Sequence, residues 1–112
     1  MMKVWGIKNC QSVKKALEVL ERKNIAYVFI DYKKNPPSAA QIGQWVQQVG
    51  IDIVLNVKGK TYRDLQLKDK NLSLDAKIAM MCEYPTLIKR PILEKDEEVY
   101  FGFDEQKYEE IL

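Results

Sequence analysis

The sequence predicts an α/β protein with a mixed sheet of about four strands. Near the start of the chain, short apolar strands at residues 3–5 and 25–31 flank an amphipathic helix. This is the pattern of a βαβ unit, in which the two strands pair in parallel. Near the end, a charged turn separates two more strands and a last helix follows. Because hairpin strands pair in antiparallel, the two patterns together require a mixed sheet.

The composition is that of an ordinary globular protein. The chain has 112 residues, of which 46% are hydrophobic and 30% charged, enough to bury the core of one domain spanning residues 1–112. The net charge is only +2, and basic residues alternate with acidic ones, which gives no sign of nucleic-acid binding. No apolar run approaches the roughly 20 residues of a membrane span, and the first strand begins too early for a signal peptide. We expect a cytoplasmic monomer without nucleic-acid or membrane partners.

The absence of histidine excludes several kinds of catalytic site. Neither a Cys–His nor a Ser–His mechanism is available. The two cysteines, Cys10 and Cys82, are far apart in the sequence and form no zinc-ligand cluster, so we expect no metal. In the cytosol a cysteine is more often catalytic or structural than disulfide-bonded.

Cys10 directly precedes the first predicted helix, residues 11–23, and Gly6 is expected to permit the turn before it. The first N–H groups of a helix lack intrahelical acceptors, and the helix dipole is positive there, so a thiolate at Cys10 is favoured over a thiol. Lys14 adds positive charge nearby. Two interpretations remain open: Cys10 is a nucleophile, or it is an inert, small apolar residue at a strand–helix turn. The buried stripe of this helix comprises Val13, Ala16, Leu17 and Leu20.

The next elements complete the βαβ unit. Asn24 is expected to take the left-handed conformation that ends the first helix. Residues 25–31 form a nearly continuous run of apolar, β-branched and aromatic side chains. Such a run is typical of a strand covered on both faces.

A helical insertion, about residues 38–84, follows. Ser38 to Gln41 is a capping box that begins a helix ending at Gly50, and residues 51–55 add a further helical turn. The basic segment 56–63 reads as a loop, either solvated surface or a binding element. Ser73 is expected to cap a third helix, whose inner face is formed by Leu74, Ile78, Met81 and Cys82.

The last part of the chain returns to the sheet. Residues 86–89 are predicted to form a strand that Arg90-Pro91 interrupts, residues 94–98 a charged turn, and residues 99–103 the second strand of the hairpin. Asp104 is expected to cap the last helix. The order β-α-β, helical insertion, β-β-α is the thioredoxin arrangement with an insertion.

Four segments in this order resemble the ArsC-type arsenate reductase family, and more narrowly its YffB and Spx branches. The resemblance implies a thioredoxin-like fold in which Cys10 is the nucleophile and Arg90 precedes a cis proline, Pro91, at the edge of the site. A guanidinium there would suit an oxyanion or a carboxylate. The segments are Gly6-Ile7-Lys8-Asn9-Cys10 with Lys14-Lys15-Ala16, residues 55–63, residues 85–93, and Gly102-Phe103.

The resemblance also implies a set of site residues. The catalytic pair is Cys10 and Arg90. The expected substrate-binding residues are Lys8, Asn9, Ser12, Lys14, Asn56, Lys58, Lys60 and Pro91.

The YffB branch implies a monothiol oxidoreductase, a glutathione-dependent thiol reductase that acts through a mixed disulfide on Cys10. No tightly bound cofactor is expected; glutathione or another small thiol would be the cosubstrate, and a small thiol or disulfide the substrate. A family member that catalyses no reaction is a further possibility.

Two alternatives within the family remain. Arsenate reductases of this family use three arginines, but Asn56 and Gly102 stand at two of the matching positions, which disfavours arsenate. Spx regulators, whose partner would be an RNA polymerase subunit, usually carry a second cysteine at the position of Val13. A Cys-x-x-Cys switch is therefore impossible here.

Overall fold

Four strands form one mixed sheet in the computed structural model, which describes all residues, 1–112. The sheet order is β2-β1-β3-β4. β1 (Met2–Gly6) pairs in parallel with β2 (Tyr27–Asp31) and in antiparallel with β3 (Ile92–Lys95), which pairs in antiparallel with β4 (Glu98–Phe101). The predicted α/β class, the βαβ unit and the mixed four-stranded sheet are confirmed.

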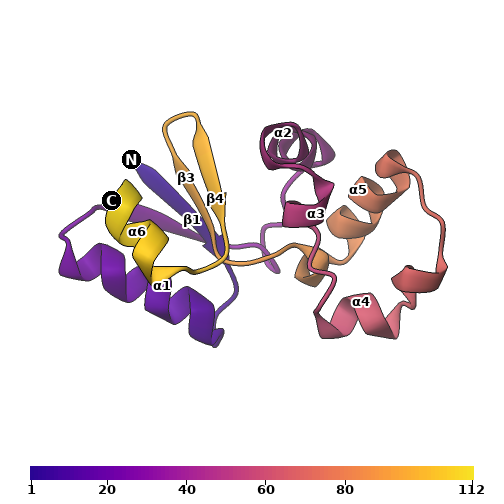
Figure 1. Cartoon of the computed structure of the whole chain (residues 1–112), viewed down its shortest axis with the longest axis horizontal. Coiled ribbons are helices and arrows are strands. Elements are labelled where there is room, and N and C mark those ends of the chain that lie inside the picture. Colours follow the sequence, from indigo (N-terminus) through magenta and orange to yellow (C-terminus); the bar gives the residue numbers. More distant parts are fainter. The chain divides into compact units, whose positions relative to one another are not determined.

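The chain divides into two compact units (Figure 1). The sheet unit consists of Met1–Tyr32 and Arg90–Leu112 and holds every strand, together with α1 (Gln11–Arg22) and α6 (Glu105–Ile111). The helical unit is Lys33–Lys89. None of the helices combines the length and the apolar character needed to cross a membrane.

In the sheet unit, α1 and α6 pack on one face of the sheet (Figure 1). Because side chains alternate along a strand, Met2 and Val4 point to the same face of β1 and meet the apolar stripe of α1. Tyr108 of α6 is buried there, and its hydroxyl donates to the Gly102 carbonyl at 3.1 Å. The rest of this core is Ala16, Val19, Leu20 and Leu93.

The helical unit contains α2 (Ala39–Val49), α3 (Ile51–Val54), α4 (Lys60–Asp64), α5 (Leu74–Glu83) and two 3₁₀ turns, η1 (Leu67–Asp69) and η2 (Pro85–Leu87). α2 packs against α3 and α5, and α5 packs against η2. The buried side chains are Ile42, Trp45, Val54, Leu55, Leu67, Met81, Leu87 and Ile88.

The structure contains the side-chain caps from which three of the helix starts were predicted. Ser38 accepts a hydrogen bond from the Gln41 amide, Ser73 from the Ala76 amide and Asp104 from the Lys107 amide, each at 3.1 Å. Each bond satisfies a backbone N–H group of the first helical turn, which has no acceptor within the helix. Asn24 has a φ of 59°, the left-handed conformation predicted for the end of α1.

The predicted strand at residues 86–89 is wrong. Pro85–Leu87 forms the 3₁₀ turn η2, and only Ile88 makes a single antiparallel bridge, to Leu55. Leu87 and Ile88 are buried within the helical unit. A short apolar run with one β-branched residue has the same pattern in a strand and in any other buried segment.

The predicted loop at residues 56–63 is partly wrong, since α4 begins at Lys60. An ion pair between Lys60 and Asp64, one helical turn apart, lies on its exposed face. The sequence pattern could not reveal this helix because it is only five residues long.

Two predictions of burial are also wrong. β2 is not covered on both faces, since none of its five residues is fully buried and the side chain of Val28 is 46% exposed. Leu74, predicted on the inner face of its helix, is 48% exposed. The charged hairpin turn is shorter than expected, because β3 extends to Lys95 and β4 begins at Glu98.

Candidate active site

Residues from three distant parts of the chain meet at one end of the central strands. β1 and β2 are parallel, so both finish at this end, where Gly6 pairs with Asp31. β3 is antiparallel to β1 and therefore begins there, with Ile92 paired to Trp5. The chain segments that leave β1 and β2 and enter β3 carry Cys10, Tyr32 and Arg90 respectively.

Cys10 is the N-cap residue of α1. Its backbone is extended, with φ −103° and ψ 125°, and its carbonyl accepts the first helical hydrogen bond, from the Lys14 amide at 3.0 Å. Asn9, with a φ of 64°, turns the chain into this position. The thiol is half-buried and free, and the first turn of the helix contains no acidic residue. The predicted position of Cys10 at the positive end of a helix is confirmed.

Arg90 lies beside Cys10 and precedes Pro91 in a cis peptide bond, as the resemblance implied. Its Nη1 donates to the Tyr32 hydroxyl at 3.3 Å, and a hydrogen bond joins its side chain to Cys10. Burial lowers the pKa of Arg90, but the interactions with Tyr32 and then with Cys10 outweigh it and raise that pKa. The guanidinium is therefore permanently charged at the sulfur.

Tyr32 is the residue of this cluster that sequence reasoning missed. It directly follows β2, its side chain is fully buried, and its amide donates to the Gly6 carbonyl at 3.0 Å. Burial raises the pKa of Tyr32 to about 12, against the opposing effect of Arg90. The phenol is thus neutral at physiological pH and can accept from Arg90. The only sequence signal was an aromatic residue at the end of an apolar strand.

Four predicted binding residues flank Cys10 in the sheet unit. Lys8 and Asn9 are exposed in the turn before it, Ser12 is half-buried in the first turn of α1, and Lys14 is exposed one turn along the helix. Pro91, the fifth predicted binding residue of this unit, is buried next to Arg90. Lys8, Asn9, Ser12 and Lys14 thus carry cationic and polar groups within four residues of Cys10 in the chain.

Asn56, Lys58 and Lys60 belong to the helical unit. The Asn56 amide donates to the Leu87 carbonyl at 2.7 Å, and the Lys58 carbonyl accepts from Arg63 at 3.0 Å. The ammonium of Lys60 pairs with Asp64. The structure thus brings these three together in one segment at the start of α4, where Lys60 already has an anionic partner.

The remaining sulfur and the Spx switch position lie elsewhere. Cys82 is a free, half-buried residue of α5. Val13 is a buried residue of α1, and a Cβ added to Gly6 would lie 2.8 Å from its Cγ2. No group of three or more histidine, cysteine, aspartate or glutamate residues is placed to hold a metal ion.

The cluster of Cys10, Arg90 and Tyr32 has the chemistry of an activated nucleophile. A helix N-terminus and a guanidinium both stabilise a thiolate. The same guanidinium can donate two parallel hydrogen bonds to an anionic group of a substrate held next to the sulfur. No base is needed once the sulfur is ionised.

Comparison with known proteins supports this description. The model of the ArsC family matches residues 5–111. A Haemophilus influenzae protein of uncharacterised function is 40% identical over 111 residues, which cover 97% of this chain and 96% of that protein. The global transcriptional regulator Spx 2 of Bacillus cereus is 24% identical over 100% of this chain and 87% of its own length.

Solved structures agree over the full length. A protein named YFFB superimposes with a TM-score of 0.93 at 33% identity, covering 100% of this chain and 99% of its own. An arsenate reductase from Vibrio cholerae gives a TM-score of 0.87 at 31% identity, covering 99% and 97% of the two chains. The predicted resemblance and the thioredoxin-like fold are both confirmed.

Proposed function

The chain belongs to the ArsC family, and we propose that it is a monothiol oxidoreductase. In this proposal Cys10 is the nucleophile and glutathione is the reducing thiol. The observation that carries the proposal is the position of Cys10, at the N-terminus of α1 and hydrogen-bonded to Arg90. Both neighbours favour the thiolate, which is the reactive form of cysteine. The similarity to arsenate reductases supports thiol chemistry at this position.

The proposed reaction has two exchange steps. The Cys10 thiolate attacks the glutathione sulfur of a mixed disulfide R–S–S–G, forms a Cys10–S–S–G bond and releases R–S⁻, which takes up a proton. A second glutathione thiolate then attacks the Cys10–S–S–G bond, releases Cys10 as thiolate and leaves as G–S–S–G. The net reaction is R–S–S–G + G–SH → R–SH + G–S–S–G, in which the R sulfur is reduced, the sulfur of the incoming glutathione is oxidised, and Cys10 returns unchanged.

An external thiol is required because the motif around Cys10 contains no resolving cysteine. The position that would carry one in a Cys-x-x-Cys motif is Val13, and Cys82 belongs to the helical unit. In this proposal Arg90 binds a glutathione carboxylate as well as stabilising the thiolate. Lys8, Asn9, Ser12 and Lys14 would contribute further hydrogen bonds around the sulfur. Asn56, Lys58 and Lys60, which belong to the helical unit, stay predicted substrate-binding residues.

Mass spectrometry after incubation with oxidised glutathione tests the proposal. We expect one glutathione adduct, located on Cys10 by peptide mapping, that reduced glutathione removes. The Cys82→Ser variant should form the same adduct and the Cys10→Ser variant none. Adducts on both cysteines at equal rates, or an adduct on Cys82 alone, would contradict the proposal, because Cys10 would then have no special reactivity.

A regulatory function of the Spx kind is the second candidate, favoured by the similarity to Spx 2 over the whole chain. It predicts retention of RNA polymerase subunits by the immobilised protein, and retention by the Cys10→Ser variant as well. The oxidoreductase proposal predicts no such retention. The two candidates are thus separated by one pull-down with purified polymerase.

Arsenate is the third candidate substrate, favoured by the similarity to the Vibrio cholerae arsenate reductase. Asn56 and Gly102 stand at two positions where the resemblance implies arginine. Arg90 would then be the one guanidinium available to stabilise the two negative charges of arsenate. We therefore expect arsenate turnover, measured with reduced glutathione and glutaredoxin, to be far slower than exchange with a glutathione mixed disulfide. A faster rate with arsenate would reverse this ranking.

A further inference from the structure

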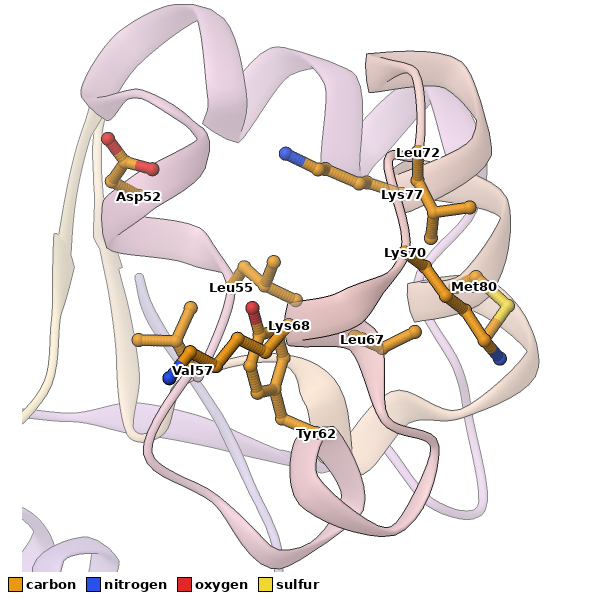
Figure 2. A pocket seen from close by; sticks show the side chains of 10 residues that line it. All are labelled: Asp52, Leu55, Val57, Tyr62, Leu67, Lys68, Lys70, Leu72, Lys77 and Met80. Atoms are coloured by element: carbon orange, nitrogen blue, oxygen red, sulfur yellow. The ribbon is translucent and has the colours of Figure 1, made fainter.

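The helical unit contains a cavity of about 220 Å³ that lies entirely within residues 52–80 (Figure 2). It is bounded by α3, by α4 with the segment before it, by η1 and by α5. All of its lining belongs to the helical unit, whereas Cys10 and Arg90 belong to the sheet unit. None of the residues assigned above to the thiol chemistry lines it.

The base of this cavity is apolar, whereas its rim carries polar and charged side chains. Leu55 and Leu67 are buried at its base, only 7% and 6% exposed, and Leu72 and Met80 close one side. The hydroxyl of Tyr62 points from α4 toward Leu55 in Figure 2. An apolar cavity with a few convergent polar groups is the usual form of a small-molecule site.

The charges around the cavity are predominantly positive. Three lysines and one aspartate, Asp52, line it. In Figure 2 the ammonium of Lys77 extends into the cavity toward the side of Asp52, while the ends of Lys68 and Lys70 are directed away from its centre. Lys77 is half-buried, and the structure gives its ammonium no ion pair or hydrogen bond. One cation therefore points inward above an apolar base.

We propose that this cavity binds a small monocarboxylate with an apolar body. The carboxylate would accept hydrogen bonds from Lys77 and the Tyr62 hydroxyl, and the apolar body would cover Leu55 and Leu67. A single inward ammonium matches one negative charge better than the two or more of a phosphate ester. The volume lies below the roughly 300–1,000 Å³ that drug-sized ligands occupy, which limits the ligand to a short chain or a single ring.

Amide chemical shifts in a ¹⁵N-labelled sample, titrated with hexanoate, test the proposal directly. We expect saturable shifts at Leu55, Val57, Tyr62 and Leu67, with a dissociation constant on the order of 1 mM, as expected for so small a ligand. Hexanol and hexylamine should bind at least about fivefold more weakly, because they lack the charge that Lys77 attracts. Inorganic phosphate, which lacks the apolar body, should cause no saturable shift at Leu55 or Leu67.

Two variants with opposite expected effects separate binding from loss of folding. Lys77→Met keeps the length of the side chain and should weaken hexanoate binding about fivefold, while Asp52→Asn removes the repelling carboxylate and should strengthen it about twofold. Lys34→Met, an exposed lysine of the same unit outside the cavity, is the matched control and should change nothing. A damaged fold could not bind hexanoate more tightly.

The proposal is overturned by any of three results: no saturation at about ten times the expected dissociation constant, equal affinity for hexanoate and hexylamine, or equal affinity in the Lys77→Met and Lys34→Met variants. Because every probe reports on the helical unit, the titration can be repeated on Cys10→Ser with the same expected result. Failure of the thiol chemistry and failure of this site are therefore distinguishable.

Discussion

Tyr32 joins the guanidinium of Arg90 to the end of β2 through one hydrogen bond of 3.3 Å. Arg90 is only half-buried, so without this bond its side chain would have more freedom to leave the sulfur. The phenol itself is fixed by complete burial and by the hydrogen bond of its own amide to Gly6. Tyr32 is thus a positioning residue, which acts on Cys10 through Arg90.

Tyr32→Phe removes this acceptor and keeps the buried ring. A hydrogen bond to a charged group contributes about 1.5–3 kcal/mol, and the length of this one places it near 1 kcal/mol of unfolding free energy. Urea unfolding measures the loss. Tyr27→Phe is the matched control, because the Tyr27 hydroxyl donates to Glu21 in an exposed pair, for which we expect less than about 0.5 kcal/mol. Equal losses in the two variants would contradict the role of Tyr32.

The raised pKa of Tyr32 makes stability depend on alkaline pH. Its folded value of about 12 exceeds the ordinary value of 10.0, so above pH 10 the folded state holds a proton that the unfolded state has lost. The stabilisation is complete below pH 10 and decreases as the pH rises to 12, by about 2–3 kcal/mol. Burial raises the pKa of Tyr108 too, and this acts in the same direction.

Unfolding free energies at pH 9, 10 and 11 in wild type and Tyr32→Phe isolate the effect, because lysine ionisation is common to both proteins. We expect the wild type to lose stability with pH more steeply than the variant, by about 1.4 kcal/mol per pH unit at most. Parallel curves would mean that Tyr32 ionises at its ordinary pH in the folded protein.

At this scale the sequence predicted part of the candidate site. Cys10 could be placed at a helix N-terminus because the apolar stripe that begins at Val13 is local in the sequence. The contact of Cys10 with Arg90 came from the resemblance, and Tyr32 was missed. Both depend on strand pairings between residues far apart in the chain, which local periodicity does not encode.

Among the elements, the packing of α1 on β1 depends on Gly6. The sequence suggested that Gly6 permits a turn, but it is the last residue of β1, and the positive φ of the turn belongs to Asn9. A Cβ on Gly6 would lie 2.8 Å from Cγ2 and 3.3 Å from Cγ1 of Val13. Glycine is thus needed for the close approach of the strand to the helix that carries Cys10.

Gly6→Ala should therefore destabilise the protein by about 1–3 kcal/mol, the usual cost of overpacking. Combining it with Val13→Ala should restore part of the loss, since the clash disappears. Gly43→Ala is the matched control: it lies within α2 with nothing within 4 Å of the added Cβ, and it should stabilise by about 0.5–1 kcal/mol. Urea unfolding measures the free energy of unfolding of the wild type and of these three variants. A Gly6→Ala variant as stable as the wild type would contradict the close approach of strand and helix.

Elements with caps and a long periodic stripe were predicted correctly, and short ones were not. α2, α5 and α6 each begin at a residue whose side chain caps the helix, and the apolar stripe of α1 covers two turns. α4 and η2 span five and three residues, too few to show a period. β2 was predicted to be covered on both faces because its run is almost entirely apolar, but an apolar run does not reveal whether a helix packs on each face of the strand.

The sequence predicted that the whole chain forms one domain. The structure divides the chain into two compact units, and whether these behave as one domain stays a prediction. Each unit comprises about half of the 112 residues, a size at which a domain is only marginally stable alone. The sheet unit is also discontinuous, since the chain leaves it after Tyr32 and returns at Arg90. We expect the two units to unfold together.

Each unit contains one tryptophan, so fluorescence can follow each separately: Trp5 lies in the sheet unit and Trp45 in the helical unit. In Trp45→Phe the remaining signal reports on the sheet unit, and in Trp5→Phe on the helical unit. Within each variant we expect the urea midpoint from fluorescence to equal that from far-ultraviolet circular dichroism. Separate midpoints would show that the units unfold independently.

In the proposed function, Arg90 and the N-terminus of α1 favour the thiolate of Cys10 over the thiol. The most direct test is the rate of iodoacetamide alkylation of Cys10 at pH 7, in a Cys82→Ser background, with and without Arg90→Met. Arg22→Met, which removes an exposed arginine of the same helix, is the control. We expect Arg90→Met to slow alkylation by roughly threefold to tenfold and Arg22→Met to leave it unchanged. Equal rates in all three proteins would contradict the claim.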